Sequence, residues 1–341
     1  MGKVHGRDKS YGYIIAMRVT SLGSGSSGNA LLVEAGPKRR TKLLVDAGLN
    51  GRLLIDRLRR VGVSPAQLQG VLVTHEHSDH IIGLPVLMRR YAVPVIADPR
   101  TIEAIEQSFA SSVWRTDAGG TYEEHTYAQS TEPNPESVLP VVGDPVTREE
   151  NSTNGMWQGN KLQHTASFSI GSRYVIGDIE VISFPVSHDA VAPCGYLLSA
   201  GGCRVCVVID SGEVTPVMLE VMSQADLLIL ESNHDRQLLL RGPYPDALKQ
   251  RILSSTGHLS NDQAAEAVLR TWPTDSVRWL WLSHLSRTNN TPKLALNSMR
   301  ASIQAAKANL AQLHITVSPP GMGGVWDSTQ LWESPSLWEI G

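Results

Sequence analysis

The densest group of residues able to do chemistry is VLVTHEHSDH at residues 71–80. Four potential metal ligands, His75, His77, Asp79 and His80, fall within six positions of this segment. Two imidazoles two residues apart can converge on one ion, and the Asp-His pair just beyond them can face a second ion. The spacing therefore predicts half of a two-metal hydrolytic site.

Other candidate ligands repeat the same local context. The apolar run before Thr74 predicts a buried strand, and a ligand just past its end would lie on a loop leaving a sheet. Four further places share this position among only 11 histidines in the chain: Asp46 after LLV, His188 after ISFPVS, Asp210 after VCVVI and His284 after LWLS. Such repetition at strand ends predicts one shared site.

Imidazole and carboxylate ligands suit Zn²⁺, and also Mn²⁺ where oxygen ligands are more numerous, so two divalent metal ions are expected. Two such ions, roughly 3.5–4 Å apart, hold a hydroxide and clamp a phosphoryl or carbonyl oxygen. An additional carboxylate would fix a ligand imidazole through its far N–H. The assignment is His75, His77 and His188 to the first ion, Asp79, His80 and His284 to the second, Asp210 as a bridge, and Asp46 as the supporting carboxylate.

Composition limits the class of protein. With 341 residues, 41% of them hydrophobic, the chain can bury one large core or two modest ones. A net charge of −3 provides no global basic field, and no apolar run approaches the roughly 20 residues of a membrane helix. Three cysteines form no disulfide framework, which favours the cytoplasm. Cys203 and Cys206 lie on one predicted strand and should point to opposite faces, so we reject a chelating or redox pair.

The glycine-rich segment GSGSSG at residues 23–28 lies between predicted strands at 17–22 and 29–34. A dinucleotide-binding fingerprint needs a helix after its last glycine, so that interpretation fails. A turn between antiparallel strands is the main interpretation, and an anion-binding nest of backbone N–H groups is the alternative.

Two runs of strands, each followed by helices, predict an α/β (α+β) fold of two face-to-face sheets with helices outside. One helix is expected at 81–91, through Pro85, because proline is tolerated in a first turn. The predicted organisation is an N-terminal extension at 1–16, a domain at 17–318 with an insertion at about 110–165, and a tail at 319–341. His125 and His164 in the insertion are expected to be solvated. Trp326, Trp332 and Trp338 in the tail are expected to cap a sheet edge or form an oligomer contact.

The motif HEHSDH, with the downstream His and Asp residues, is similar to the metallo-β-lactamase superfamily, whose fold is an αβ/βα sandwich of two mixed sheets with outer helices. Iron oxidoreductases of that superfamily usually carry Glu where this chain has His77, so the resemblance implies a hydrolase. A narrower resemblance covers residues 17–310 outside the insertion. The segments SLGSGSSGN, FPVSHDAVAPCGY, LLILESNHD, RGPYPDALKQRILSSTGHLSN and LSHLSRTNNTPKLA resemble the YycJ (WalJ) group, which includes a 5′→3′ exonuclease on double-stranded DNA.

This resemblance implies DNA duplex ends as substrate and leaves the oligomeric state open. It implies catalytic roles for Asp79, His234 and His258, and substrate contacts from His234, His258 and Asn290. Basic residues that could contact DNA are scattered after residue 230, and they include Arg236, Arg241, Lys249, Arg251 and Arg287.

Two alternatives remain at the level of the sequence. Mild acidity and the insertion, which could cover the site, favour a small-molecule phosphodiesterase or a glyoxalase-type thioesterase. A non-catalytic module that keeps a metal pocket for structure is the alternative of another class, and the full ligand set argues against it.

Overall fold

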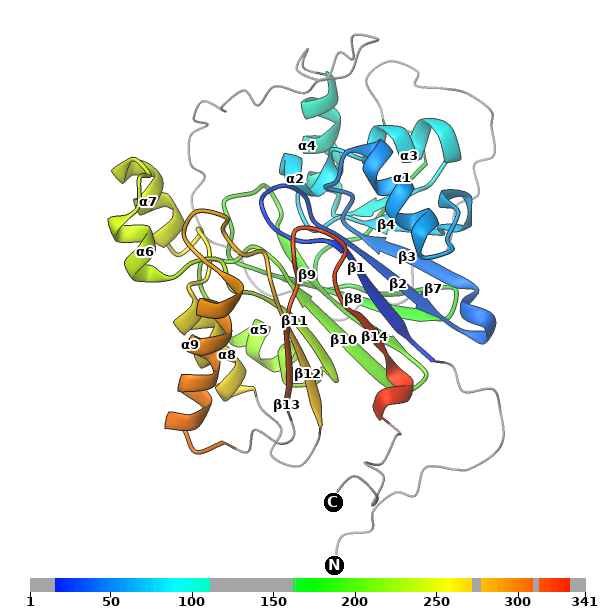
Figure 1. The fold of residues 1–341 in the computed structure, drawn as a ribbon. Coiled ribbons are helices and arrows are strands. Elements are labelled where there is room, and N and C mark those ends of the chain that lie inside the picture. The colour runs from blue at the N-terminus through cyan, green and yellow to red at the C-terminus, as the bar shows by residue number, and fades with distance from the viewer. Residues whose placement is uncertain (1–15, 111–161, 163, 272–276, 309–312, 332–341) are drawn as a thin grey trace, which may run out of the picture.

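The computed structural model describes residues 16–110, 162, 164–271, 277–308 and 313–331. Within that part of the chain, two seven-stranded sheets form the centre of the molecule (Figure 1). In spatial order, the first sheet contains β14 (Val325–Asp327), β1 (Arg18–Gly23), β2 (Ala30–Ala35), β3 (Thr41–Val45), β4 (Gly70–Leu72), β5 (Val95–Ala97) and β6 (Thr165–Ser167). The second contains β13 (Leu313–Val317), β12 (Arg278–Ser283), β11 (Leu227–Glu231), β10 (Cys203–Val208), β9 (Cys194–Ala200), β8 (Ile179–Pro185) and β7 (Arg173–Ile176).

Helices cover the outer face of each sheet, which completes the predicted four-layer sandwich (Figure 1). On the first sheet's side lie α1 (Gly51–Arg60), α2 (Ser78–Ile81), α3 (Leu84–Tyr91) and α4 (Pro99–Ala110). The second half of the chain contributes α5 (Pro216–Met222), α6 (Arg236–Arg241), α7 (Asp246–Leu253), α8 (Asn261–Arg270) and α9 (Pro292–Ala305). None of the helices in the described residues combines the length and apolar character of a membrane span.

Side-chain alternation along the strands builds separate cores. Val33 and Val205 face the layer between the two sheets, whereas Leu32 packs under the helices of the first sheet. Cys203 lies in the layer between the sheets and Cys206 on the helix-covered face, so the two thiols point apart as predicted. All three cysteines of the chain are buried.

Parallel pairing brings several strand ends to one edge. In the first sheet β3, β4 and β5 run parallel, and in the second β10, β11, β12 and β13 do. Strand β8 pairs antiparallel with β9, which pairs antiparallel with β10, so β8 runs in the direction of β10. The loops that follow β3, β4, β8, β10 and β12 carry the predicted ligands and the supporting Asp46.

The structure confirms the turn interpretation of the glycine-rich segment. Strands β1 and β2 pair antiparallel around it, and Gly25 and Gly28 adopt φ values of 116° and 130°, which favour glycine. Ser24 in this turn accepts a hydrogen bond from the backbone N–H of His284 at 2.8 Å, so the turn also supports a predicted ligand.

The single helix expected at 81–91 was wrong. Two helices, α2 and α3, occupy this stretch and separate at Ile82 and Gly83. Pro85 lies in the first turn of α3, where its missing N–H costs nothing. Gly83 donates its N–H to Ala47 O at 2.7 Å and packs so closely on that backbone that a side chain would collide with it. The helix is therefore interrupted where the backbone packs against the loop after β3.

The insertion, including His125, lies outside the described residues except at its ends, where His164 is exposed as expected. Trp332 and Trp338 also lie outside them. Residues 325–327 of the tail form the edge strand β14 beside β1, with Trp326 buried between the sheets. For this part of the tail, the structure supports the sheet-edge interpretation.

Trp326→Ala should lower the free energy of unfolding by about 3–5 kcal/mol, because it removes a large buried side chain from the inter-sheet core. Val325→Ala on the same strand is the matched control, since Val325 is 45% exposed against 1% for Trp326. Urea unfolding of both variants measures the difference. Equal, small losses in the two variants would show that the edge strand contributes little.

Candidate metal centre

The predicted ligands lie on loops that leave the strands in an unusual backbone conformation. Asp46 follows β3, Asp210 follows β10 and His284 follows β12, with φ values of 62°, 63° and 53°. These left-handed conformations cost a non-glycine residue on the order of 1–3 kcal/mol each and concentrate at functional sites. Each turns the chain sharply at the strand end, so the side chain is directed at the site instead of continuing the alternation of the sheet.

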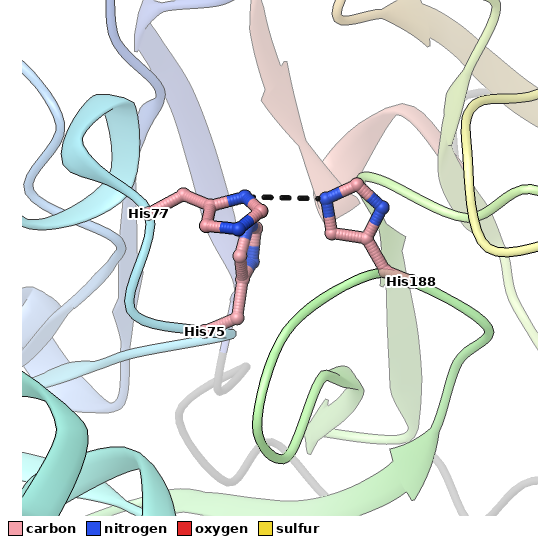
Figure 2. A group of neighbouring side chains, drawn as sticks. All are labelled: His75, His77 and His188. Atoms are coloured by element: carbon pink, nitrogen blue, oxygen red, sulfur yellow. Dashed lines mark hydrogen bonds between the residues drawn. The ribbon is translucent and has the colours of Figure 1, made fainter. Parts of the chain in front are cut away.

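The first ligand group consists of three imidazoles, His75, His77 and His188 (Figure 2). His77 Nδ1 and His188 Nε2 are 3.3 Å apart. His188 Nδ1 donates to Gly257 O at 3.0 Å, and this contact leaves its Nε2 directed at the group. His75 and His188 are buried, and His77 is half-buried. The structure therefore brings together the three residues that the sequence assigned to the first ion.

The second ligand group consists of Asp79, His80, Asp210 and His284. The Oδ2 atom of Asp79 lies 3.7 Å from His80 Nε2 and 3.5 Å from His284 Nε2. Asp210 Oδ2 lies 2.9 Å from His80 Nε2, and its Oδ1 atom lies 2.5 Å from His284 Nδ1. The structure thus brings the three residues predicted for the second ion together with Asp210, the predicted bridge.

Asp210 lies between the two groups. Its Oδ2 atom is 2.9 Å from His80 Nε2 in one group and 3.4 Å and 3.9 Å from His75 and His188 Nε2 in the other. Burial raises the pKa of this carboxyl, but the imidazoles of His284 and His80 outweigh burial and hold its pKa well below the ordinary value. It is therefore an anion at neutral pH, in the position that a bridging ligand requires.

The donor set fits a divalent cation. The Nε2 atoms of His75 and His284 are buried and accept no hydrogen bond from the described residues. Metal–ligand bonds of about 2.0–2.2 Å place tetrahedral ligand atoms roughly 3.3–3.6 Å apart, close to several of the separations above. Burial and neighbouring imidazoles push the pKa of His75 well below its ordinary value, which leaves it neutral and able to bind metal.

The negative charge of the carboxylates around His80 also favours a bound cation. Burial opposes its protonated form, but the carboxylates of Asp46, Asp79 and Asp210 outweigh burial and raise its pKa well above the ordinary value. Three carboxylates this close together, two of them buried, are stabilised only when positive charge is present among them. A metal ion would supply that charge and leave His80 free to act as a ligand.

Asp46 occupies the position that its predicted supporting role requires. Its Oδ2 atom accepts from His80 Nδ1 at 2.8 Å, which directs His80 Nε2 toward Asp210. Asp46 also accepts from the N–H and the hydroxyl of Thr74, and the same hydroxyl lies 3.0 Å from His75 Nδ1. Thr74 therefore links Asp46, which supports the second ligand group, to His75 of the first. This residue was not among the predicted site residues.

The structure adds Glu231, which sequence reasoning missed. Its carboxylate is fully buried and lies 2.7 Å from His258 Nδ1 and 3.0 Å from His284 Nδ1. Burial lowers the pKa of His258, but Glu231 and Asp210 outweigh burial and raise it to about 10. A local sequence signal for Glu231 was available, because this residue follows the apolar run LLIL just as Asp46 and Asp210 follow apolar runs.

Two predicted substrate contacts lie deeper in the fold than expected. His234 is 1% exposed, neither ring nitrogen has a partner among the described residues, and burial lowers its pKa to about 4. The side-chain amide of Asn290 donates to Ser232 O, Asn233 O and Asn261 Oδ1. This network occupies both amide hydrogens of Asn290, so the side chain has no donor left for a phosphate.

The fold and this constellation of His and Asp residues define a metallohydrolase of the metallo-β-lactamase class. Family models agree: "Metallo-beta-lactamase superfamily" matches residues 23–171 and "Beta-lactamase superfamily domain" matches residues 133–278. The chain is 34% identical to "Exodeoxyribonuclease WalJ" of Streptococcus pneumoniae over 87% of this chain and 91% of that protein. It is also 34% identical to "Exodeoxyribonuclease YycJ" of Bacillus anthracis, over 84% and 88% of the two chains.

The chain therefore belongs to the WalJ/YycJ family within the metallo-β-lactamase superfamily. Among solved structures, it is similar to the metallo-β-lactamase fold protein YhfI from Bacillus subtilis, with a TM-score of 0.58 and 18% identity. That match covers 92% of this chain and 99% of the other, and it confirms the fold.

Asp46→Ala should weaken metal binding by about 10- to 100-fold, because His80 loses the carboxylate that orients it. Competition between the protein and a chelator for Zn²⁺ measures the affinity. Asp56→Asn is the control, since Asp56 pairs with Arg60 on the outer helix α1. Unchanged affinity in Asp46→Ala would mean that this carboxylate does not support a metal ligand.

Proposed function

We propose that this protein is a metal-dependent exodeoxyribonuclease that acts on duplex ends with two divalent cations, Zn²⁺ or Mn²⁺. The observation that carries the proposal is the convergence of seven ligand-type side chains from the strand ends of both sheets, in a chain similar over most of its length to proteins named exodeoxyribonucleases. We place the protein in the reducing cytoplasm, because its three cysteines provide no disulfide framework.

We assign the first cation to His75, His77 and His188, and the second to Asp79, His80 and His284, with Asp210 between them. Two such cations would supply Lewis-acid activation of water and of a phosphodiester. The buried carboxylates of Asp46 and Glu231 hold the far nitrogens of His80 and His284, so these imidazoles cannot rotate away. The ligand geometry is thus fixed before the substrate binds.

Asp79 is the acidic group of the cluster best placed to receive a proton. Its side chain is 22% exposed, whereas those of Asp210 and Glu231 are almost fully buried. The Asp79 carboxylate, which faces His80 and His284, can therefore also accept a hydrogen bond from an incoming water. This position combines a metal ligand with a contact to the attacking nucleophile.

His258 is placed to deliver a proton to the leaving oxygen. Its Nδ1 atom is held by Glu231 at 2.7 Å, and its side chain is 19% exposed, so Nε2 is the ring atom available to substrate. The Glu231 carboxylate favours the protonated ring, as the raised pKa shows. We assign no step to His234 or Asn290, because the first is buried and the second is engaged within the fold.

Purified protein with Mn²⁺ should shorten a 5′-phosphorylated DNA duplex from its 5′ ends, as followed on a denaturing gel with label at either end. Asp79→Asn should reduce the rate by about 10³-fold or more, since it removes a charged ligand and the acceptor near the nucleophile. RNA, a cyclic nucleotide and a glutathione thioester form the substrate panel. Preferred turnover of one of these over duplex DNA would contradict the proposal.

His258→Ala should slow cleavage of DNA by about 10²- to 10⁴-fold, the usual contribution of a positioned general acid. Cleavage of bis(p-nitrophenyl) phosphate should fall much less, because nitrophenolate leaves without a proton. The ratio of the two losses, measured as kcat, reports proton donation specifically. Equal losses on both substrates would mean that His258 supports the site structurally instead of donating a proton.

A further inference from the structure

Arg251 is a basic residue on α7 that the proposed reaction does not use. Its Nε atom donates to Asp189 Oδ2 at 2.5 Å, and the other oxygen of Asp189 lies 3.3 Å from His188 Nε2. Nε2 is the nitrogen by which His188 faces His77, so it is the atom directed at the first ligand group. One carboxylate thus separates the Arg251 guanidinium from a metal-facing atom.

The segment that carries Arg251 is held firmly against the His188 loop. Ser187 Oγ donates to Ser255 O at 2.8 Å, and Asp189 N donates to Thr256 O at 3.0 Å. His188 Nδ1 completes the set with its bond to Gly257 O. These three contacts join residues 187–189 to residues 255–257, which follow α7 directly. Arg251 on α7 therefore keeps a defined position beside the metal centre.

The Arg251 side chain is 56% exposed, and Nε–Asp189 is the hydrogen bond that the described residues make with its guanidinium. Its terminal NH₂ groups therefore remain available at the rim of the site. The pKa of Arg251 is raised by Asp189 first and also by Asp210 and Asp79, so the guanidinium lies within the field of the metal-site carboxylates. An exposed ion pair of this kind contributes little to stability, which leaves its position beside the ligands to be explained by binding.

We propose that the guanidinium of Arg251 binds a phosphate of the nucleic-acid substrate next to the scissile one, with Asp189 holding the side chain in place. This inference rests on the proposed nuclease function. A planar guanidinium offers paired N–H donors that match phosphate oxygens, and a fixed guanidinium loses less entropy on binding than a free one. The neighbouring phosphate is either the 5′-terminal monophosphate or the next internal phosphodiester.

Arg251→Gln should raise KM for duplex DNA by about 10-fold or more, because one charged phosphate contact is lost. The dependence of log Kd on log salt should become shallower by about one, the change expected for one phosphate contact. Metal content and kcat on bis(p-nitrophenyl) phosphate, which has no neighbouring phosphate, should stay within about 2-fold of the wild type. The KM of Arg251→Lys for duplex DNA should fall between those of the wild type and Arg251→Gln, since lysine keeps the charge without the paired donors.

Arg173→Gln is the matched control. Arg173 forms an exposed ion pair with Glu180 at 2.9 Å, and the exposed fractions of 66% and 34% resemble the 56% and 30% of Arg251 and Asp189. It lies on the edge strand β7 of the second sheet. This variant should leave both KM and the salt dependence unchanged.

A second variant separates phosphate binding from support of His188. Asp189→Asn should keep the salt dependence of the wild type, because Arg251 still carries its charge. An equal loss of salt dependence in Asp189→Asn and Arg251→Gln, or loss of metal from both Arg251 variants, would overturn the inference. Duplexes with 5′-phosphate and 5′-hydroxyl ends then identify the phosphate, since an effect confined to the first indicates the terminal group and an effect on both indicates the internal one.

The two proposals fail in different ways. If the wild type cleaves duplex DNA and Arg251→Gln matches it in KM and salt dependence, only the assignment of Arg251 is overturned. If the wild type cleaves no nucleic acid while its metal centre hydrolyses the model ester, the proposed function fails and the phosphate contact fails with it.

Discussion

The Asp210 carboxylate, buried between two groups of imidazoles, is the interaction on which this site depends. Its oxygens lie within 4 Å of His75, His80, His188, His258 and His284, which come from four segments far apart in the chain. A buried carboxylate is costly unless positive charge surrounds it, and buried imidazoles alone supply that charge only by taking up protons. A bound cation removes this conflict, because it neutralises the acid and uses neutral imidazoles as ligands.

The two-sheet architecture is what makes this convergence possible. Parallel strands in both sheets end at the same edge, and left-handed turns at Asp46, Asp210 and His284 direct their side chains into the site. Backbone hydrogen bonds join the loops, from Asn29 N to Asp79 O and from Ala47 N to His80 O, both at 2.8 Å. The motif at residues 75–80 is therefore held by the turn after β1 and by the loop after β3, and the strain at the strand ends is offset by the packing of two complete cores.

Exposure increases outward from this buried centre. Asp210, His80 and Glu231 are enclosed, Asp79 and His258 are partly accessible, and Arg251 lies at the rim. Enclosed groups have fixed charge and geometry, which suits metal ligation and the positioning of ligands. Accessible groups can contact a substrate without a rearrangement of the fold. The proposed roles therefore follow burial, with metal ligation at the buried centre and substrate contacts at the exposed rim.

The sequence by itself predicted which His and Asp residues come together and the two-sheet fold, because both depend on local patterns. An apolar run followed closely by His or Asp marks a strand end, and HxHxDH places four candidate ligands within six residues. Applied to the run ending at Glu231, the same rule would have found that residue too.

Tertiary structure alone decided which polar groups face one another. Arg251 and Asp189 are 62 residues apart, His188 and Gly257 are 69 apart, and their contacts depend on how the loops align at the sheet edge. The same alignment buries His234, occupies Asn290 within the fold and pairs the tail strand of Trp326 with β1. A local pattern carries no information on these distant contacts, because hydrogen-bond partners and burial are set by the packing of segments that are separate in sequence.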